Sequence, residues 1–196
     1  MNSVSITAAI LAGGAAKRLG GHDKGLQLLL GKPLIAWVYE RVSAQVQSIA
    51  ICANRHVDNY AIYAPVVCDV NAGFPGPLAG IVSAFQTLKD DWLLTLPVDC
   101  PTPPLDLAQR LYEACKDSNS TAAFVRDGQR RQPLFALYHR DLNLSAQTAL
   151  VQNIGVWQWQ ESIKAIAVDF SDQTAAFVNL NTPQDFLDFE ANRHEC

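Results

Sequence analysis

The sequence predicts an α/β protein, in which a mostly parallel sheet lies between two layers of helices (a three-layer α/β/α arrangement). Short, nearly continuous apolar runs, such as 6–12 and 92–96, are typical of strands buried on both faces. Between these runs lie segments whose apolar residues recur at helical spacing, and strands that alternate with helices pair in parallel. No repeat, low-complexity segment or linker divides the sequence, so we expect a single domain over residues 1–196.

Glycine, proline and aspartate mark the boundaries of the expected elements. The first run ends at Gly13, and Pro33 can open a helix at its first turn. Asp127-Gly128 lies between two apolar runs and predicts a hairpin, while Thr182-Pro183 predicts the start of the last helix. The expected strands are 6–12, 49–53, 65–68, 92–96, 121–126, 132–139, 165–170 and 177–178; the expected helices are 33–46, 78–88, 105–116, 142–152 and the segment after 182.

Composition excludes several classes of protein. With 49% hydrophobic and 17% charged residues, the 196-residue chain is typical of a globular protein. Its net charge of −4 gives no basic face for non-specific nucleic-acid binding. No apolar stretch approaches the roughly 18 residues of a membrane span. Five cysteines without a CxxC pair or a signal peptide indicate reduced thiols. We therefore expect a cytoplasmic protein that binds neither nucleic acid nor membrane.

A glycine-rich, basic loop follows the first expected strand. Its paired glycines, Gly13 and Gly14, let backbone N–H groups approach an anion closely. Lys17, Arg18 and Lys24 add three cations to the same loop. These features describe a cradle for a triphosphate, although the loop matches neither the dinucleotide fingerprint nor the P-loop pattern. A solvated surface loop is the alternative interpretation.

Asp99 follows the apolar run 92–96 almost directly. In an open parallel sheet, ligands bind beyond the carboxyl ends of the strands. A carboxylate fixed there is a natural ligand for Mg²⁺, which takes one or two carboxylates together with substrate phosphates. An aspartate that caps a turn before a proline explains the local pattern equally well.

Asp69 ends the third expected strand and precedes the Pro/Gly-rich segment 73–80, which contains Gly76. The Asp69 carboxylate could accept hydrogen bonds from a nucleobase or a ribose. The Pro/Gly segment could shape a pocket for the base. An ordinary aspartate at a strand end is the alternative.

The sequence lacks the residues of several other catalytic mechanisms. Its four histidines are scattered, and no Ser or Cys occupies a nucleophile-elbow pattern. A reaction whose acceptor is itself a phosphate needs in-line positioning and charge neutralisation but no general base. A site rich in Gly, Lys, Arg and Asp therefore predicts transfer of a nucleoside monophosphate to a phosphorylated acceptor.

An ordered set of motifs resembles the molybdenum cofactor guanylyltransferases, which have the Rossmann-like α/β fold of nucleotide-diphospho-sugar transferases. The resemblance covers nearly the whole chain. It rests on Leu-Ala-Gly-Gly at 11–14, Arg-Leu-Gly-Gly-His-Asp-Lys-Gly at 18–25, Gly-Lys-Pro-Leu at 31–34, Ala-Asn-Arg-His at 53–56, Pro-Gly-Pro-Leu-Ala-Gly at 75–80, Pro-Val-Asp-Cys-Pro at 97–101 and Val-Asn-Leu-Asn-Thr-Pro at 178–183.

The resemblance implies transfer of GMP from Mg-GTP to the terminal phosphate of molybdenum-carrying molybdopterin, with release of pyrophosphate. It also makes other molybdenum cofactor biosynthesis proteins, apo-molybdoenzymes and their chaperones candidate partners. The matching positions are Leu11, Ala12 and Gly13 for guanine and phosphates, Lys24 for phosphate, Asp69 for the nucleoside, Asp99 for the metal and phosphates, Arg18 for the transfer step, and Asn179, Asn181 and the loop after Asp127-Gly128 for the pterin side.

Two positions bear on the choice of base. Cys52 stands where the family often has Asn, and a thiol is a weak hydrogen-bond partner, so we expect any nucleotide contact there to come from its backbone. Related cytidylyltransferases tend to carry Leu-Ala-Ala-Gly, and the missing Cβ at Gly13 leaves more room for a purine. A cytidylyltransferase or sugar-phosphate nucleotidyltransferase of the same fold, and a non-catalytic cofactor carrier, are the alternatives.

Overall fold

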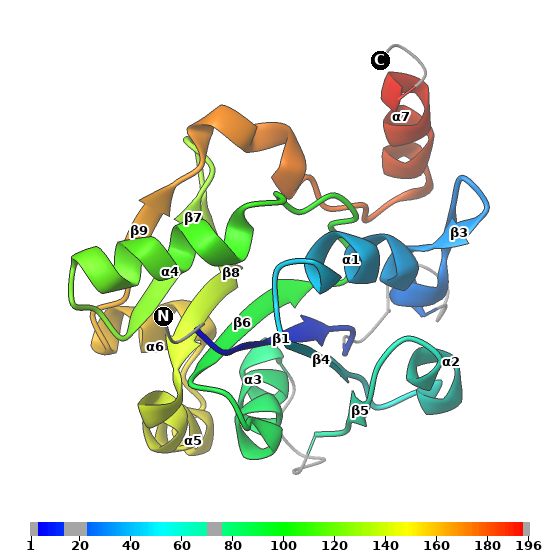
Figure 1. The fold of residues 1–196 in the computed structure, drawn as a ribbon. Coiled ribbons are helices and arrows are strands. Elements are labelled where there is room, and N and C mark those ends of the chain that lie inside the picture. The colour runs from blue at the N-terminus through cyan, green and yellow to red at the C-terminus, as the bar shows by residue number, and fades with distance from the viewer. Residues whose placement is uncertain (1–3, 14–22, 70–75, 194–196) are drawn as a thin grey trace.

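A computed structural model of the chain describes residues 4–13, 23–69 and 76–193. Its main feature is a seven-stranded sheet in the order β5-β4-β1-β6-β8-β7-β9 (Figure 1). A separate two-stranded ribbon pairs β2 with β3. The strands are β1 (Ile6–Leu11), β2 (Leu28–Leu29), β3 (Lys32–Pro33), β4 (Ser48–Cys52), β5 (Val66–Val67), β6 (Trp92–Pro97), β7 (Ala122–Arg126), β8 (Arg131–His139) and β9 (Ile166–Asp169).

The sheet is mostly parallel, as the sequence predicts. β1 pairs in parallel with β4 on one side and β6 on the other, so that Leu11 lies level with both Cys52 and Pro97. β4 pairs in parallel with β5, and β7 with β9. Among the described strands of this seven-stranded sheet, β8 alone runs antiparallel to both of its neighbours, β6 and β7. The carboxyl ends of β1, β4, β5 and β6 therefore meet at one edge of the sheet.

Helices cover both faces of the sheet. On one face, Ile10 of β1 belongs to a core cluster with Val38 of α1 (Leu34–Ser43) and Leu111 of α4 (Leu107–Asp117). On the other face, Leu11 packs with Ile81 and a second set of helices (Figure 1). Alternate residues of β1 thus enter opposite cores, which explains its continuous apolar run. The second set is α3 (Pro77–Thr87), α5 (Asn143–Val151) and α6 (Val156–Ser162).

The expected hairpin around Asp127 and Gly128 is confirmed. The Asp127 carboxylate Oδ1 accepts hydrogen bonds from the backbone N–H groups of Gln129 at 3.0 Å and Arg130 at 2.7 Å. Gly128 has a φ of +89°, which favours glycine. Because β7 is parallel to β6 in the sheet, this turn lies at the same edge as the end of β6.

The expected strand at 177–178 is wrong. Ser171–Phe177 forms the 3₁₀ helix η3, and Val178 follows it without joining the sheet. The ring of Phe177 packs edge-on against Phe135 and Phe170, with centroid separations of 5.1 and 5.6 Å. Aromatic packing and not strand pairing therefore accounts for Phe177, while Val178 is exposed.

Several short elements were not predicted, but the terminal helix was. The unpredicted helices are α2 (Val57–Ala61), α6, η1 (Lys24–Leu26) and η2 (Arg140–Leu142). Helix α7 (Pro183–Arg193) begins at the predicted proline and stands at one end of the molecule (Figure 1). Leu180, just before α7, is fully buried with Leu29 and Leu34, which anchors the start of α7 to α1 and the β2–β3 ribbon. No helix in the described residues is long and apolar enough to cross a membrane.

Candidate active site

Three predicted site residues from distant parts of the chain meet at the carboxyl edge of the sheet. Lys24 opens η1, Asp99 follows β6, and Asn181 precedes α7. The ammonium Nζ of Lys24 lies 2.7 Å from Asp99 Oδ2 and also donates a hydrogen bond to Asn181 Oδ1. The side chains of Lys24 and Asp99 are 23% and 19% exposed, so the ion pair is shielded but reachable by a ligand.

The second carboxylate oxygen of Asp99 has no hydrogen-bond partner among the described residues. Asp99 Oδ1 is buried and accepts no hydrogen bond from the described residues. The backbone holds the residue in place, because Val98 N donates to Leu11 O at 3.1 Å and Leu180 N donates to Asp99 O at 2.8 Å. A buried carboxylate oxygen without a partner is costly, so this atom is a candidate for binding a cation.

A side-chain cap at the start of α7 fixes Asn181. The backbone N–H groups of Asn181 and Thr182 each donate to Asp185 Oδ2 at 2.7 Å, and Asp185 N donates back to Thr182 Oγ1 at 3.2 Å. The hydrogen bonds from Asn181 and Thr182, with a smaller effect of the Lys24 charge, lower the pKa of Asp185. Asn181 therefore reaches Lys24 from a rigid helix start.

The end of β1 presents its backbone to the same edge. Ala12 N donates to Cys52 O at 2.9 Å, which extends the β1–β4 pairing one residue beyond the strand. Gly13, the next residue, is exposed. A Cβ added there would lie 3.7 Å from Cys52 O, which is an ordinary contact, and the φ of Gly13 is not positive. The described protein structure thus does not itself require glycine at this position, whereas a ligand bound against the backbone would.

The side chain of Cys52 faces away from this edge. Its Sγ donates to Gly80 O of α3 at 3.4 Å, and the residue is 3% exposed. Burial, followed by the negative charge of Asp69, raises the pKa of Cys52 to about 12. The thiol is therefore a neutral packing group against α3, and a nucleotide contact of Cys52 remains a prediction for its backbone.

Asp69 is paired with Asn54, a residue that sequence reasoning did not select as a site residue. Asn54 Nδ2 donates to Asp69 Oδ2 at 2.6 Å, and Asp69 N donates to Asn54 Oδ1 at 2.7 Å. Asn54 follows β4 and Asp69 follows β5, so both lie at the carboxyl edge. The position of Asn54 just beyond a strand end, within the quoted Ala-Asn-Arg-His motif, was the signal that could have identified it.

The remaining predicted residues are only partly placed. Gly14 and Arg18 lie outside the described residues. Gly76 precedes α3 with a φ of +140°, and a Cβ there would meet no atom of the described residues within 4 Å, so the backbone conformation is what favours glycine. Asn179 is exposed two residues before Asn181.

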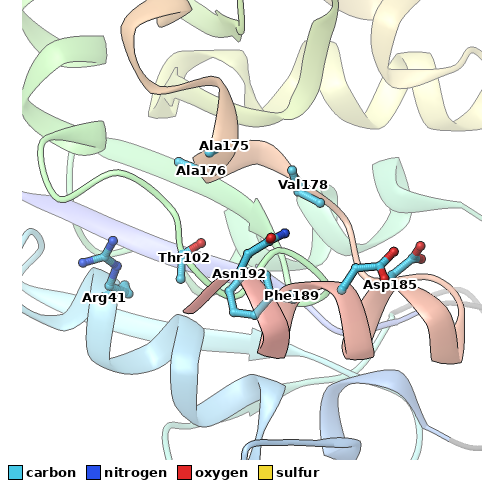
Figure 2. A pocket seen from close by; sticks show the side chains of 9 residues that line it. Arg41, Thr102, Ala175, Ala176, Val178, Asp185, Phe189 and Asn192 are labelled. Carbon is cyan, nitrogen blue, oxygen red and sulfur yellow. The ribbon is translucent and has the colours of Figure 1, made fainter. Parts of the chain in front are cut away.

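A pocket of about 480 Å³ adjoins the site beneath α7. Figure 2 shows Asp185, Phe189 and Asn192 of α7 on one side and Arg41 of α1 on another. Asp185 also caps the helix start that holds Asn181, so the pocket and the Lys24–Asp99 pair share this residue. The volume lies within the range of small-molecule sites. The remaining lining residues are Thr102, Ala175, Ala176, Val178 and Asp188.

Comparisons with known proteins agree on one family. Residues 8–166 match the MobA-like NTP transferase domain. The chain is 43% identical over 193 residues to a molybdenum cofactor guanylyltransferase of Histophilus somni (strain 2336), covering 96% of this chain and 97% of the relative. It is 40% identical over 185 residues to the molybdenum cofactor guanylyltransferase of Mannheimia succiniciproducens, covering 93% and 97%.

The chain belongs to the molybdenum cofactor guanylyltransferase family. A solved structure supports the fold independently. Molybdopterin-guanine dinucleotide biosynthesis protein A from Archaeoglobus fulgidus superposes with a TM-score of 0.80 at 21% identity, covering 97% of this chain and all of that chain. The relatives confirm the family that the motifs predicted, and the solved structure confirms the predicted fold.

The described part of the site offers no cluster of side-chain ligands for a metal. Among the residues that the structure describes, no group of three or more His, Cys, Asp or Glu side chains could hold a metal ion. A cation at Asp99 would therefore take most of its ligands from substrate and water. Mg²⁺ commonly binds in this way, through one or two carboxylates and substrate phosphates.

Proposed function

We propose that the protein transfers the GMP unit of GTP to the terminal phosphate of molybdenum-loaded molybdopterin and releases pyrophosphate. The single observation that carries this proposal is the convergence of Lys24, Asp99 and Asn181 at the carboxyl edge of the sheet, in a chain of this family. Phosphate transfer requires positive charge, a carboxylate that can bind a metal, and backbone groups open to phosphate. The Lys24 ammonium, the Asp99 carboxylate and the backbone at Gly13 provide these groups.

The reaction is a direct displacement at the α-phosphorus of GTP. An oxygen of the acceptor phosphate forms the new phosphorus–oxygen bond. The bond from the α-phosphorus to the oxygen that bridges to the β-phosphorus breaks, and its electron pair leaves with pyrophosphate. The acceptor oxygen is already ionised near neutral pH, so no side chain has to remove a proton.

Lys24 supplies positive charge where the triphosphate is expected. Its ammonium is held by Asp99 and Asn181, and it can exchange these partners for phosphate oxygens without a large movement of the chain. A charge-assisted contact of this kind is about twice as strong as one between neutral groups. We therefore assign Lys24 to triphosphate binding and to stabilising negative charge during transfer.

Asp99 is the residue that fits a Mg²⁺ ion. Its buried Oδ1 lacks a donor among the described residues, and a divalent cation would satisfy this oxygen. Bound there, Mg²⁺ would supply further neutralisation of the phosphate oxygens. The carboxylate would then hold the metal on one oxygen while the other stays near Lys24.

The nucleoside is expected on the β1, β4 and β5 side of the site. Gly13 leaves its backbone open to a base, and the Asn54–Asp69 pair lies at the ends of the neighbouring strands. A carboxylate accepts hydrogen bonds well from ribose hydroxyls and from the N–H groups of guanine. The acceptor is expected on the opposite side, near Asn179, Asn181 and the pocket that begins at Asp185.

A comparison of nucleotides tests the base. We expect GTP with Mg²⁺ to raise the melting temperature more than ATP, CTP or UTP, since a specific ligand stabilises the folded state by mass action. A larger shift with CTP or UTP would replace the guanine assignment with a cytidylyl- or uridylyltransferase. Pyrophosphate release on addition of the acceptor then distinguishes an enzyme from a carrier, because a carrier would bind GTP without releasing pyrophosphate.

The cellular setting follows from the substrates. GTP is a cytoplasmic metabolite, and we propose that the protein acts in the cytoplasm. Proteins that supply molybdopterin and apo-enzymes or chaperones that receive the product are the proposed partners.

A further inference from the structure

Tyr60 contacts the Lys24 turn from outside the site. We infer that Tyr60 is a positioning residue for the reaction, because its buried hydroxyl holds, through Asp23, the turn that carries Lys24. This inference rests on the proposed function for its readout in turnover. Among the described residues, Tyr60 contacts neither Asp99 nor any group assigned to substrate, so its effect would pass through Lys24.

The Asp23 carboxylate links Tyr60 to the turn. The Tyr60 hydroxyl donates to Asp23 Oδ1, and Gly25 N donates to the same oxygen at 3.2 Å. Asp23 is the N-cap of η1, whose first residue is Lys24. Asp23 Oδ1 therefore accepts hydrogen bonds from the Tyr60 hydroxyl and from the backbone N–H of Gly25. These hydrogen bonds fix Asp23 and Gly25, the residues on either side of Lys24 in the chain.

Close packing at Gly25 also holds this turn in place. A Cβ at Gly25 would overlap the Tyr60 hydroxyl and lie 2.9 Å from Val98 Cγ2. The backbone of η1 thus packs closely against both Tyr60 and Val98, the residue that directly precedes Asp99. This close approach requires glycine and sets the position of Lys24 relative to Asp99.

Tyr60 is rigid enough for this role. It is fully buried in the core cluster that contains Ile35 and Val38 of α1. Burial, then the hydrogen bond to Asp23, raises the pKa of Tyr60 well above its ordinary value, so the hydroxyl keeps its proton and remains a donor. Phenylalanine would fill the same space and remove only the bond to Asp23.

A second buried tyrosine provides a matched control. Tyr138 of β8 is also fully buried, and its hydroxyl oxygen accepts a hydrogen bond from Gln160 Nε2 at 2.7 Å on the α6 side of the sheet. Tyr60→Phe and Tyr138→Phe each remove one buried hydroxyl from the core. They differ in that only the hydroxyl of Tyr60 is linked to the Lys24 turn.

The test uses the full chain and measures GTP affinity by calorimetry and pyrophosphate release with Mg²⁺ and acceptor. We expect Tyr60→Phe to lower kcat/KM for GTP about tenfold or more, and Tyr138→Phe to leave it within about twofold. In a Lys24→Ala background, Tyr60→Phe should have no further effect, because the residue through which it acts is missing. Asp23→Asn, which weakens the same link from its other end, should lower kcat/KM in the same direction.

Two results would overturn the inference. One is equal kcat/KM for the Tyr60→Phe and Tyr138→Phe proteins. The other is that Tyr60→Phe lowers kcat/KM as much in the Lys24→Ala background as it does in the wild type. That result would indicate a general structural role for Tyr60. A wild-type protein that binds GTP but releases no pyrophosphate would refute the proposed function alone, and GTP affinity in the same variants would still decide the role of Tyr60.

Discussion

Lys24 Nζ lies 2.7 Å from Asp99 Oδ2, although the two residues are 75 positions apart in the chain. The pair joins a short 3₁₀ turn to the end of the central strand β6. Within this ion pair, each side chain neutralises the charge of the other. Binding of a metal and a triphosphate would give both residues new partners of opposite charge, with little change in their positions.

Replacing Asp99 separates its role in turnover from its role in folding. We expect Asp99→Asn to lower turnover about 100-fold or more, since a lost group of this kind costs about 3 kcal/mol in the transition state. The unfolding free energy should change by less than about 1 kcal/mol, because the loss of the ion pair is offset by the lower cost of burying a neutral amide in place of a charged carboxylate. Pyrophosphate release and chemical denaturation measure the two quantities.

Asp106, which also lies in the segment after β6, serves as a control. Its carboxylate accepts hydrogen bonds from Gln173 Nε2 and lies 3.8 Å from Arg110, away from the Lys24 pair. Asp106→Asn should leave turnover unchanged. Near-normal turnover of Asp99→Asn would refute the metal and phosphate role.

Two glycines at the site should respond oppositely to alanine. Gly13→Ala should keep or slightly raise the melting temperature, because its Cβ has room and alanine reduces the freedom of the unfolded chain. GTP affinity should nevertheless fall about tenfold, and the preference for GTP over CTP should narrow. Gly25→Ala should instead destabilise the fold, because its Cβ would overlap Tyr60. Unchanged GTP binding by Gly13→Ala would contradict a ligand at this backbone.

The Asn54–Asp69 pair should behave as one unit. We expect Asn54→Ala and Asp69→Ala each to weaken GTP binding about five- to tenfold, in keeping with the roughly 1 kcal/mol of a hydrogen bond. Because the two residues hold one another, the double variant should be little worse than either single variant. Calorimetry on the three proteins checks this, and fully additive losses would show that the two side chains act independently.

Thiol modification provides a footprint of nucleotide binding. Cys68, beside Asp69, is the exposed cysteine among the described residues, while Cys52, Cys100 and Cys115 are buried. Burial raises the pKa values of Cys52 and Cys115 to about 12, so neither forms thiolate at pH 8. With Cys196 replaced by serine, one thiol should react rapidly with Ellman's reagent, and Mg-GTP should slow that reaction. An unchanged rate with saturating GTP would place the nucleoside elsewhere.

Local sequence signals predicted much of the sheet and two of the three site residues that meet, Lys24 and Asp99. Apolar runs that end in Gly or Asp place Gly13 and Asp99 at strand ends, and the turn chemistry of Asp127 and Gly128 predicts the hairpin. Parallel pairing then brings these ends to one edge. Asn181 was selected only through the resemblance to the family, and its contact with Lys24 was not predicted.

The residues that the sequence did not reveal depend on long-range packing. Tyr60 lies in a five-residue helix that is too short for a periodic apolar pattern, and its partner Asp23 is 37 positions away. Asn54 acquires its partner only when β4 and β5 pair. Phe177 packs in an aromatic cluster. A pattern of only two apolar residues cannot distinguish a residue in such a cluster from a residue in a strand.

The most direct test of guanylyl transfer follows the label from GTP into the acceptor. The protein is incubated with Mg²⁺, molybdenum-loaded molybdopterin and GTP labelled at either the α- or the γ-phosphate, and the products are separated by chromatography. The account predicts that the α label enters the pterin product and the γ label leaves as pyrophosphate, and that Asp99→Asn produces neither. Entry of the γ label into the acceptor, or bound GTP that never gives up its α label, would contradict it.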